Sequence, residues 1–347
     1  MNHPRIINEN MLDEWVRANA RTAQGVTVEL VWRLVAAACP SPSHRRFPLT
    51  DSIGQHGPDG ELDTPVGFPP SVPDGRSFWE IGAGLDARAK ANSDYNDLTK
   101  IVPQNVRVAS SFVFVTPLSG RRDWENTWKE DGVATWVEER RNRNEWANVH
   151  VLNGASLIDW LYRFPAVERW LAGIMGMKID FIETLDARWE TLRMIGNPPP
   201  LSPELFTVSR DAAVKKVQKL VIDRDGAQLK LDTKQPEQAA DFVSAYAVSL
   251  PEDQRIEAIG RCLIVTQEDA WSSVCSLNES HVLIADFDLE SERGLKLIQS
   301  ALNRRHAVIF PGMPGGIPHA NRAPLPTPDE YQIKASLEKA GYPRACY

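Results

Sequence analysis

The stretch SFWEIGAGLDARAKANSDY, residues 77–95, joins a strand pattern to a helix pattern and decides the fold of the first half. In residues 77–81 successive side chains alternate between two faces, as in a β-strand, and Glu80 shares a face with a phenylalanine. Two glycines then interrupt the pattern, and Asp86 stands where a helix N-cap belongs. We therefore expect a strand over 77–81 followed by a helix over 87–100.

Strands and helices alternate on both sides of this stretch. The further elements expected in the first half are a helix over 26–39, strands over 111–116 and 148–152, and a helix over 155–175 that breaks near Pro165. The strand SFVFVT is almost continuously apolar, which is typical of a strand buried on both faces. This alternation predicts an α/β sandwich with a mixed sheet.

The segment Asn-Pro-Pro-Pro, residues 197–200, is the strongest interruption in the chain and predicts a domain boundary, with domains over 1–196 and 197–347. Beyond it strands and helices alternate again, which predicts a second α/β domain built on a parallel sheet. Its expected strands are 228–232, 261–266, 281–286 and 306–310, and its expected helices are 210–221, 236–249, 268–276, 290–304 and 328–340.

Length and composition are those of a soluble protein with two domains: 347 residues, 42% hydrophobic and 24% charged. The four cysteines form no CxxC pair, so a reducing compartment is expected and a zinc cluster is not. No apolar run is long enough to span a membrane and the N-terminus has no signal-peptide pattern, which predicts a cytoplasmic protein without membrane contact. The net charge of −7 means that any contact with nucleic acid must depend on a local basic patch.

Carboxylates and one lysine gather around residues 57–95. Metal-dependent phosphodiester cleavage needs two or three carboxylates at a divalent cation, and it gains from a lysine near the developing phosphorane charge. Asp59 lies in a Pro-Asp-Gly turn, Glu80 lies near the end of a strand, and Lys90 and Asp94 share one face of a helix. Each has an ordinary alternative role, as a turn residue, a solvated strand position or a surface ion pair.

The sequence GPDG, followed by SFWEIGAG and KANSDY, resembles a divergent PD-(D/E)XK nuclease domain, of the Mrr or restriction-endonuclease-like kind found in bacterial antiviral defence proteins. The likeness covers roughly residues 20–176. By residue type alone, Glu29 on the expected first helix is a further candidate ligand. The likeness implies a restriction-endonuclease-like α/β sandwich in which Asp59 and Glu80 bind Mg²⁺ or Mn²⁺. It also implies that Lys90 is the catalytic lysine and that Asp94 orients it.

The chain departs from this family at Gly82, where the usual motif has its lysine two residues after the glutamate. The lysine has therefore moved to the following helix or is absent, and its absence would abolish or weaken catalysis. A tryptophan-rich segment follows, whose rings are expected to be core at helical spacing rather than base-stacking platforms; they are Trp124, Trp128 and Trp136. Arginines around it are either phosphate contacts or a solvated helix face; they are Arg121, Arg122, Arg140, Arg141 and Arg143.

The second half resembles the start of a STAND- or AAA-like NTPase module. Its loop TKQPEQ, residues 233–238, has no glycine and no Gly-Lys-Ser/Thr with which to bind phosphate. The strand HVLIADFD carries Asp286 and Asp288 at its end, as a Walker B strand would, although an aspartate there is common in any α/β sheet. We therefore expect a degenerate module that does not hydrolyse nucleotide. Because the chain ends one helix after the last strand, a truncated or compact version is expected.

Two functions remain open from the sequence. The first is a metal-dependent endonuclease that cuts double-stranded DNA as an anti-phage effector, with a homo-oligomer or a defence-system partner protein. The second is a catalytically inactive adaptor built from two degenerate modules, which Gly82 and the TKQPEQ loop favour. An active NTPase is a weaker third reading because the phosphate loop is missing.

Overall fold

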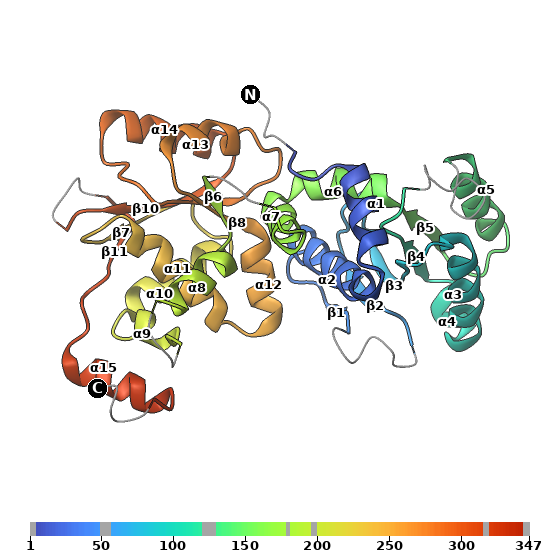
Figure 1. Ribbon diagram of the computed structural model, residues 1–347, viewed down its shortest axis with the longest axis horizontal. Coiled ribbons are helices and arrows are strands. Elements are labelled where there is room, and N and C mark those ends of the chain that lie inside the picture. The colour runs from blue at the N-terminus through green and yellow to red at the C-terminus, as the bar shows by residue number, and fades with distance from the viewer. Residues whose placement is uncertain are drawn as a thin grey trace. The chain divides into compact units, whose positions relative to one another are not determined.

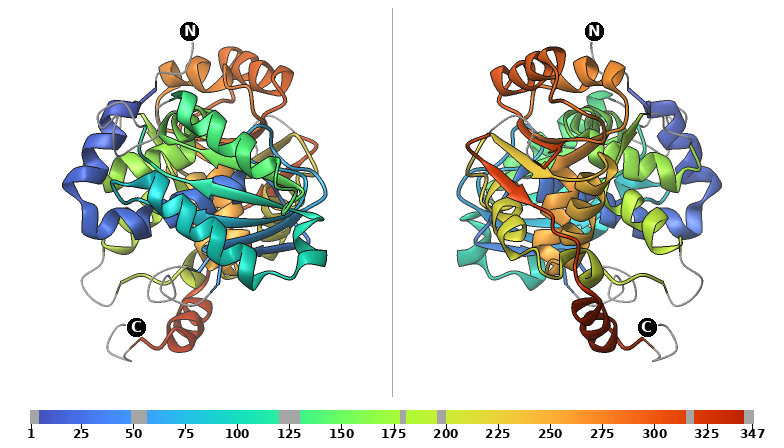
Figure 2. Two further views of the ribbon diagram at one scale, coloured as in Figure 1. Left: turned by 90° about the vertical axis from the view of Figure 1, so that its right-hand side faces the viewer. Right: turned by 90° about the vertical axis from the view of Figure 1, so that its left-hand side faces the viewer.

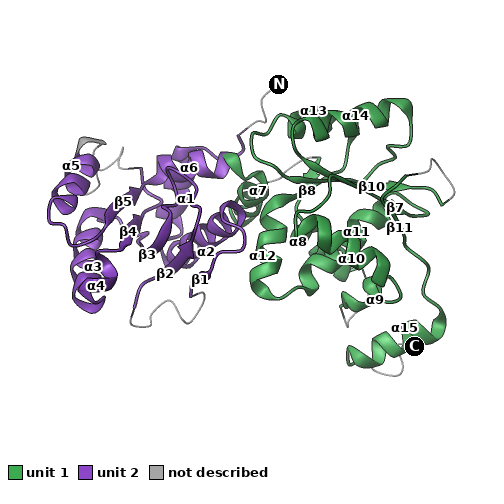
Figure 3. Cartoon of the chain, turned by 180° about the vertical axis from the view of Figure 1, so that it is seen from behind, with its two compact units in different colours: residues 1–4, 163–347 green, residues 5–162 purple. Residues whose placement is uncertain are grey.

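A computed structural model describes residues 5–48, 57–119, 130–177, 181–195, 200–314 and 319–342. The chain forms two compact units, one over Arg5–Tyr162 and the other over Arg163–Tyr347 together with Met1–Pro4 (Figure 3). The units divide between Tyr162 and Arg163, ahead of the boundary expected at residue 197, and residues 196–199 lie outside the described ranges. The expected two-domain α/β organisation is confirmed.

The first unit is a five-stranded sheet with helices on both faces (Figure 1). Its helices are α1 (Glu9–Ala18), α2 (Ala20–Ala38), α3 (Ala87–Ile101), α4 (Gln104–Arg107), α5 (Glu130–Arg141) and α6 (Gly154–Arg163). Its strands are β1 (His44–Arg46), β2 (Gly60–Thr64), β3 (Gly75–Ile81), β4 (Ser110–Val115) and β5 (Asn148–Leu152). The strand and helix expected within 77–95 are both present, and β1, β2 and α1 add to the expected elements.

The sheet of the first unit is mixed, as predicted. Its strand order is β1-β2-β3-β4-β5. The pairs β1–β2 and β2–β3 are antiparallel, and the pairs β3–β4 and β4–β5 are parallel. The change from antiparallel to parallel pairing occurs at β3, which makes this strand central to the unit. Helix α3 connects β3 to the parallel β4, as a crossover helix must.

The two faces of this sheet pack against different helices, with α2 and α3 on opposite sides (Figure 1). On one face Phe78, Phe112 and Tyr95 pack with Trp136, so the aromatic core holds α3 and α5 against the strands. On the other face Trp79 packs against Trp160 of α6. The alternation predicted for β3 is confirmed, and it directs Glu80 to the side of α3 because Glu80 is two residues from Phe78.

The second unit is a six-stranded sheet between two layers of helices (Figure 2). Its helices are α7 (Pro165–Ile174), α8 (Leu185–Arg193), α9 (Glu204–Thr207), α10 (Asp211–Val221), α11 (Glu237–Ser249), α12 (Glu252–Arg261), α13 (Glu268–Cys275), α14 (Glu292–Asn303) and α15 (Glu330–Lys339). Its strands are β6 (Ile182–Glu183), β7 (Gln228–Asp232), β8 (Cys262–Val265), β9 (Val282–Ala285), β10 (Ala307–Gly312) and β11 (Arg322–Pro324).

The strand order of the second unit is β11-β7-β10-β9-β8-β6, with five parallel strands and an antiparallel β6 at one edge. The parallel sheet was predicted, whereas the antiparallel edge strand was not. Helices α10 and α11 pack on one face and α13 and α14 on the other, which buries the strands on both sides and accounts for their apolar sequences (Figure 1). None of the helices in the described ranges is long and apolar enough to cross a membrane.

Candidate active site

The antiparallel pairing of β2 and β3 brings the two predicted metal ligands together. The register pairs Gly60 with Trp79, so Asp59, one residue before β2, lies opposite Glu80 on β3. Asp59 Oδ2 accepts a hydrogen bond of 2.8 Å from the Ile81 main-chain N–H, which fixes this carboxylate beside the end of β3. Two acids separated by 20 residues of turn-rich sequence are therefore neighbours in space.

Glu80 is a strongly perturbed acid. Its residue is 8% exposed. Burial, followed by the charges of Asp59 and Asp94, raises the pKa of its carboxyl to about 9. Burial also raises the pKa of Asp59, against the Ile81 hydrogen bond and the nearby charge of Lys90. The pair therefore keeps a proton on Glu80 at neutral pH when no cation is present, and a bound cation would displace that proton.

Lys90 occupies the space left by Gly82. A Cβ added at Gly82 would lie 2.8 Å from Lys90 Cγ and 3.2 Å from Phe114 Cζ, both too close for an unshifted side chain. Gly82 lies directly after the end of β3, two residues beyond Glu80, so the stem of Lys90 enters the site where the usual motif lysine would begin. Burial lowers the pKa of Lys90, but the hydrogen bond and charge of Asp94, with smaller contributions from Asp59 and Glu80, raise it overall.

Asp94 completes the group of charges. Lys90 Nζ donates a hydrogen bond of 2.6 Å to Asp94 Oδ1 across one turn of α3. The second oxygen, Asp94 Oδ2, is buried and accepts no hydrogen bond within the described ranges. Burial raises the pKa of Asp94, whereas Lys90 lowers it. A buried carboxylate oxygen without a donor is suited to a water or a cation.

Gln24 of α2 holds the end of β3 and was not predicted as a site residue. Its Nε2 donates to the Ile81 carbonyl at 2.7 Å, and its Oε1 accepts from the Ala83 N–H at 3.0 Å. These bonds satisfy the main chain where β3 ends, directly after Glu80. No local pattern identifies a single glutamine on a helix as such a contact, because the strand lies 57 residues further along the chain.

Glu29, the further candidate ligand from the sequence, is paired elsewhere. It lies five residues after Gln24 on α2, so its side chain is turned by about 140° from the glutamine that faces β3. Its carboxylate forms a salt bridge of 2.8 Å with Arg33. The structure therefore brings together Asp59, Glu80, Lys90 and Asp94, and not Glu29.

The arginines around α5 have structural contacts. Arg140 is 8% exposed, stacks over Trp136 at 4.1 Å from the ring centroid, and donates to Asn92. Arg141 donates twice to the Val149 carbonyl. Arg140 is therefore buried and not part of a solvated face, whereas Arg141 is exposed with its guanidinium bonded to the main chain of β5. Trp136 is core, as expected, whereas Trp124, Trp128, Arg121 and Arg122 lie outside the described residues.

The residues fit a cation held by few protein ligands. Mg²⁺ is commonly bound by one or two carboxylates, with waters and substrate phosphate completing its shell. Asp59 and Glu80 form such a pair, and the unpartnered Asp94 oxygen is part of the same charge cluster. Within the described ranges no group of three or more His, Cys, Asp or Glu side chains is arranged to hold a metal ion, so a complete protein cage is not formed there.

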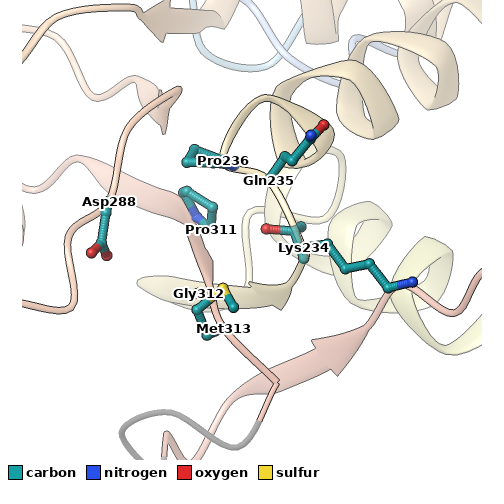
Figure 4. A pocket seen from close by; sticks show the side chains of 8 residues that line it. Lys234, Gln235, Pro236, Asp288, Pro311, Gly312 and Met313 are labelled. Carbon is teal, nitrogen blue, oxygen red and sulfur yellow. The ribbon is translucent and has the colours of Figure 1, made fainter.

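The loop TKQPEQ of the second unit borders a pocket of about 170 Å³ at the ends of β7 and β10 (Figure 4). Its main-chain amides are already bonded. Thr233 N–H donates to the Gly312 carbonyl, and the N–H groups of Lys234 and Gln235 both donate to Gln238 Oε1. The Lys234 side chain points away from Asp288 across the pocket (Figure 4). The side chain of Gln238 thus takes two main-chain N–H donors of the loop that a phosphate would otherwise bind.

Asp286, at the end of β9, is engaged by an arginine. Arg188 of α8 bonds Asp286 at 3.2 Å, and it also contacts Asp241 at 2.7 Å. Burial raises the pKa of Asp286 to about 6 although Arg188 opposes the shift. The charge of Asp286 is therefore balanced within the unit by Arg188.

Comparison of this chain with protein-family models, with curated proteins and with solved structures finds no match.

Proposed function

We propose that residues 5–162 form a metal-dependent endonuclease that cuts double-stranded DNA. The observation that carries the proposal is the position of Lys90 over Gly82, beside the Asp59–Glu80 pair. The one departure from the nuclease motif, a glycine in the lysine position, is matched by a lysine from the next helix that fills the vacated space. An inactive module would have no need of this compensation.

The order of elements in the first unit supports the same proposal. A helix, three antiparallel strands, a crossover helix and a parallel strand follow one another, with acids before the second and on the third strand. The mixed sheet supports the α/β sandwich implied by the likeness of GPDG, SFWEIGAG and KANSDY. That likeness to nucleases of antiviral defence proteins also supports a role as an anti-phage effector.

The proposed chemistry assigns a task to each residue. Asp59 and Glu80 would hold Mg²⁺ or Mn²⁺, which when bound polarises the scissile phosphate and acidifies a water. Lys90 places its ammonium near the position where charge develops on the phosphorane. Asp94 keeps Lys90 extended toward the acids, and Gln24 fixes the strand end that carries Glu80.

The second unit supports a scaffold or relay role in this proposal. Its loop amides are occupied by Gln238 and its Asp286 is paired with Arg188, so neither half of a nucleotide site is available. These same features favour the alternative, in which the whole chain is an inactive adaptor. The two functions differ in the first unit alone, where an adaptor has no use for a charge cluster that keeps a carboxyl protonated.

Incubation of supercoiled plasmid with the full chain and Mg²⁺ or Mn²⁺ tests the proposal. We expect nicked or linear product that excess EDTA prevents and that Glu80→Ala does not form. Glu61→Ala is the matched control, because Glu61 is an acid on the neighbouring β2 whose partners are surface arginines. Cleavage that persists in EDTA would refute a metal mechanism, and absence of both cleavage and metal binding would establish the adaptor.

A further inference from the structure

Three arginines line a pocket in the second unit at the amino-terminal ends of the parallel strands, whereas the TKQPEQ loop lies at their carboxyl-terminal ends. The pocket has a volume of about 200 Å³ and is bordered by the start of β9 and β10 and by the chain after α10 and α14. Its charged lining consists of Arg224, Arg261 and Arg305. All of its residues belong to the second unit, so the argument is independent of the endonuclease proposal.

Two of the three arginines have no acidic partner in a salt bridge within the described ranges. Within the described ranges Arg224 and Arg305 form no salt bridge, and both are exposed at the pocket. The nearby Glu279 is bonded by Arg163 at 2.6 Å. Although Arg224 is exposed as a residue, partial desolvation of its guanidinium, followed by the like charge of Arg261, lowers its pKa to about 10, against a weaker opposing effect of Glu257. An anion between the guanidinium groups would relieve this repulsion.

A buried histidine lies beneath them. His281 lines the pocket, is 1% exposed, and has both ring nitrogens buried without a hydrogen bond of normal geometry within the described residues. Burial, which outweighs the nearby main-chain carbonyls of Arg163 and Arg261, lowers the pKa of His281 to about 3. The ring is therefore neutral at physiological pH and adds no charge to the pocket.

An ordinary role for these arginines also exists. Helices α10, α12 and α14 end near the pocket, and basic side chains are favoured at helix C-termini, where they bond the last carbonyls. Arg261 does bond a carbonyl, that of Ser280 at 2.7 Å. Arg224 and Arg305 make no such side-chain bond in the structure as described. Capping therefore accounts for one of the three arginines and leaves two directed at the pocket.

We propose that this pocket binds a small phosphorylated anion through Arg224, Arg261 and Arg305. Guanidinium groups match phosphate oxygens with paired N–H donors, and the charge of a phosphate would balance Arg224 and Arg305, which form no salt bridge within the described ranges. The pocket has room for a phosphate group with waters. It lies at the amino edge of the parallel strands, so it is distinct from the pocket beside the TKQPEQ loop.

Calorimetry of the full chain in EDTA, with inorganic phosphate, pyrophosphate and a nucleoside monophosphate as separate titrants, tests the site. We expect at least one to bind, and we expect Arg224→Gln and Arg305→Gln each to weaken binding roughly tenfold or more. Tighter binding of the nucleoside monophosphate than of free phosphate would identify a phosphorylated metabolite as the ligand source. Arg304→Gln is the matched control, since Arg304 is the exposed neighbour of Arg305 outside the pocket lining.

Thermal unfolding without titrant separates the two roles. Loss of stability in Arg224→Gln and Arg305→Gln, with no phosphate binding by the parent chain, would show that both are helix caps and overturn the proposal. Binding that Arg304→Gln weakens equally would reduce it to general attraction by a basic surface. Duplex DNA bound through these arginines, without binding of any small titrant, would likewise overturn the small-ligand site.

Discussion

Lys90 Nζ and Asp94 Oδ1 are 2.6 Å apart on one turn of α3, and the ammonium reaches from there toward the Asp59–Glu80 pair. We expect Lys90→Met to lower plasmid cleavage by roughly a hundredfold or more, because one preorganised cation stabilises the transition state by that order. Metal affinity and the fold should remain near those of the parent.

Lys100→Met is the control for this substitution, since Lys100 lies on the same helix in an exposed pair with Asp97. Equal cleavage by the Lys90 and Lys100 variants would remove Lys90 from the mechanism. Arg88, another cation on α3, lies two residues from Lys90 and so about 160° around the helix. We therefore expect Arg88→Ala to retain cleavage.

The complementarity of Gly82 and Lys90 allows a reciprocal exchange. In a Lys90→Ala chain the space over Gly82 is vacated, so a lysine side chain introduced there by Gly82→Lys has room to extend beside Glu80. We expect this double variant to recover part of the cleavage that Lys90→Ala loses, measured as initial rate on plasmid. Gly82→Lys alone should clash with Lys90 and lose activity, and failure of the double variant to exceed Lys90→Ala would contradict the shared position.

The raised pKa of Glu80 makes stability depend on pH. The folded carboxyl holds its proton up to about pH 9, whereas the unfolded one releases it near 4.5. Between these values the folded state binds more protons, so the free energy of unfolding falls as pH rises, by at most about 1.4 kcal/mol per pH unit. We expect urea unfolding in EDTA to show this decline and Glu80→Gln to reduce it. An unchanged slope in the variant would place the perturbed proton elsewhere.

Gln24 should matter to the site through the main chain of β3. Gln24→Ala removes the donor to the Ile81 carbonyl and the acceptor for the Ala83 N–H, which is expected to cost about 1–3 kcal/mol of stability. Metal affinity measured by calorimetry should fall as well, because the residue next to Glu80 is no longer fixed. Thr22→Ala, on the same helix with a hydroxyl bonded only to the local Asn19 carbonyl, should leave metal affinity unchanged.

Nucleotide binding by the second unit should be weak or absent. The N–H groups of Lys234 and Gln235 are held by the Gln238 side chain, and the residue after them is a proline without an N–H. Calorimetry with Mg-ATP on the full chain is expected to show no micromolar binding. Such binding would mean that the loop rearranges to release its donors.

Local patterns predicted the parts of the fold that depend on them. The alternation in residues 77–81 and the cap at Asp86 gave a strand and helix that are both present, and β7 occupies the predicted 228–232. The two-residue β6 has no pattern long enough to detect, so the antiparallel edge was missed. Residues of the tryptophan-rich segment at 120–129 lie outside the described ranges.

Contacts between distant segments explain what the sequence could not supply. Gln24 and Ile81 are 57 residues apart, and Arg188 and Asp286 are 98 apart, so neither pair follows from spacing. Arg140 belongs to a basic run that suggests a surface, yet tertiary packing against Trp136 and Asn92 buries it. The position of Glu29 could not be predicted because it depends on which face of α2 meets the sheet, and the contacts of Gln24 show that face.

The division of the charge cluster between a strand and a helix has a mechanical consequence. A lysine two residues along β3 would be kept in register with Glu80 by the sheet hydrogen bonds. Here Lys90 belongs to α3, which is anchored through Tyr95 to Glu145 and through Asn92 to Trp136. A small rotation or shift of α3 on the sheet would withdraw the ammonium while leaving both carboxylates in place. In the proposed endonuclease, metal binding and competence to cut would therefore be separate states, and the position of α3 on the sheet would control competence to cut.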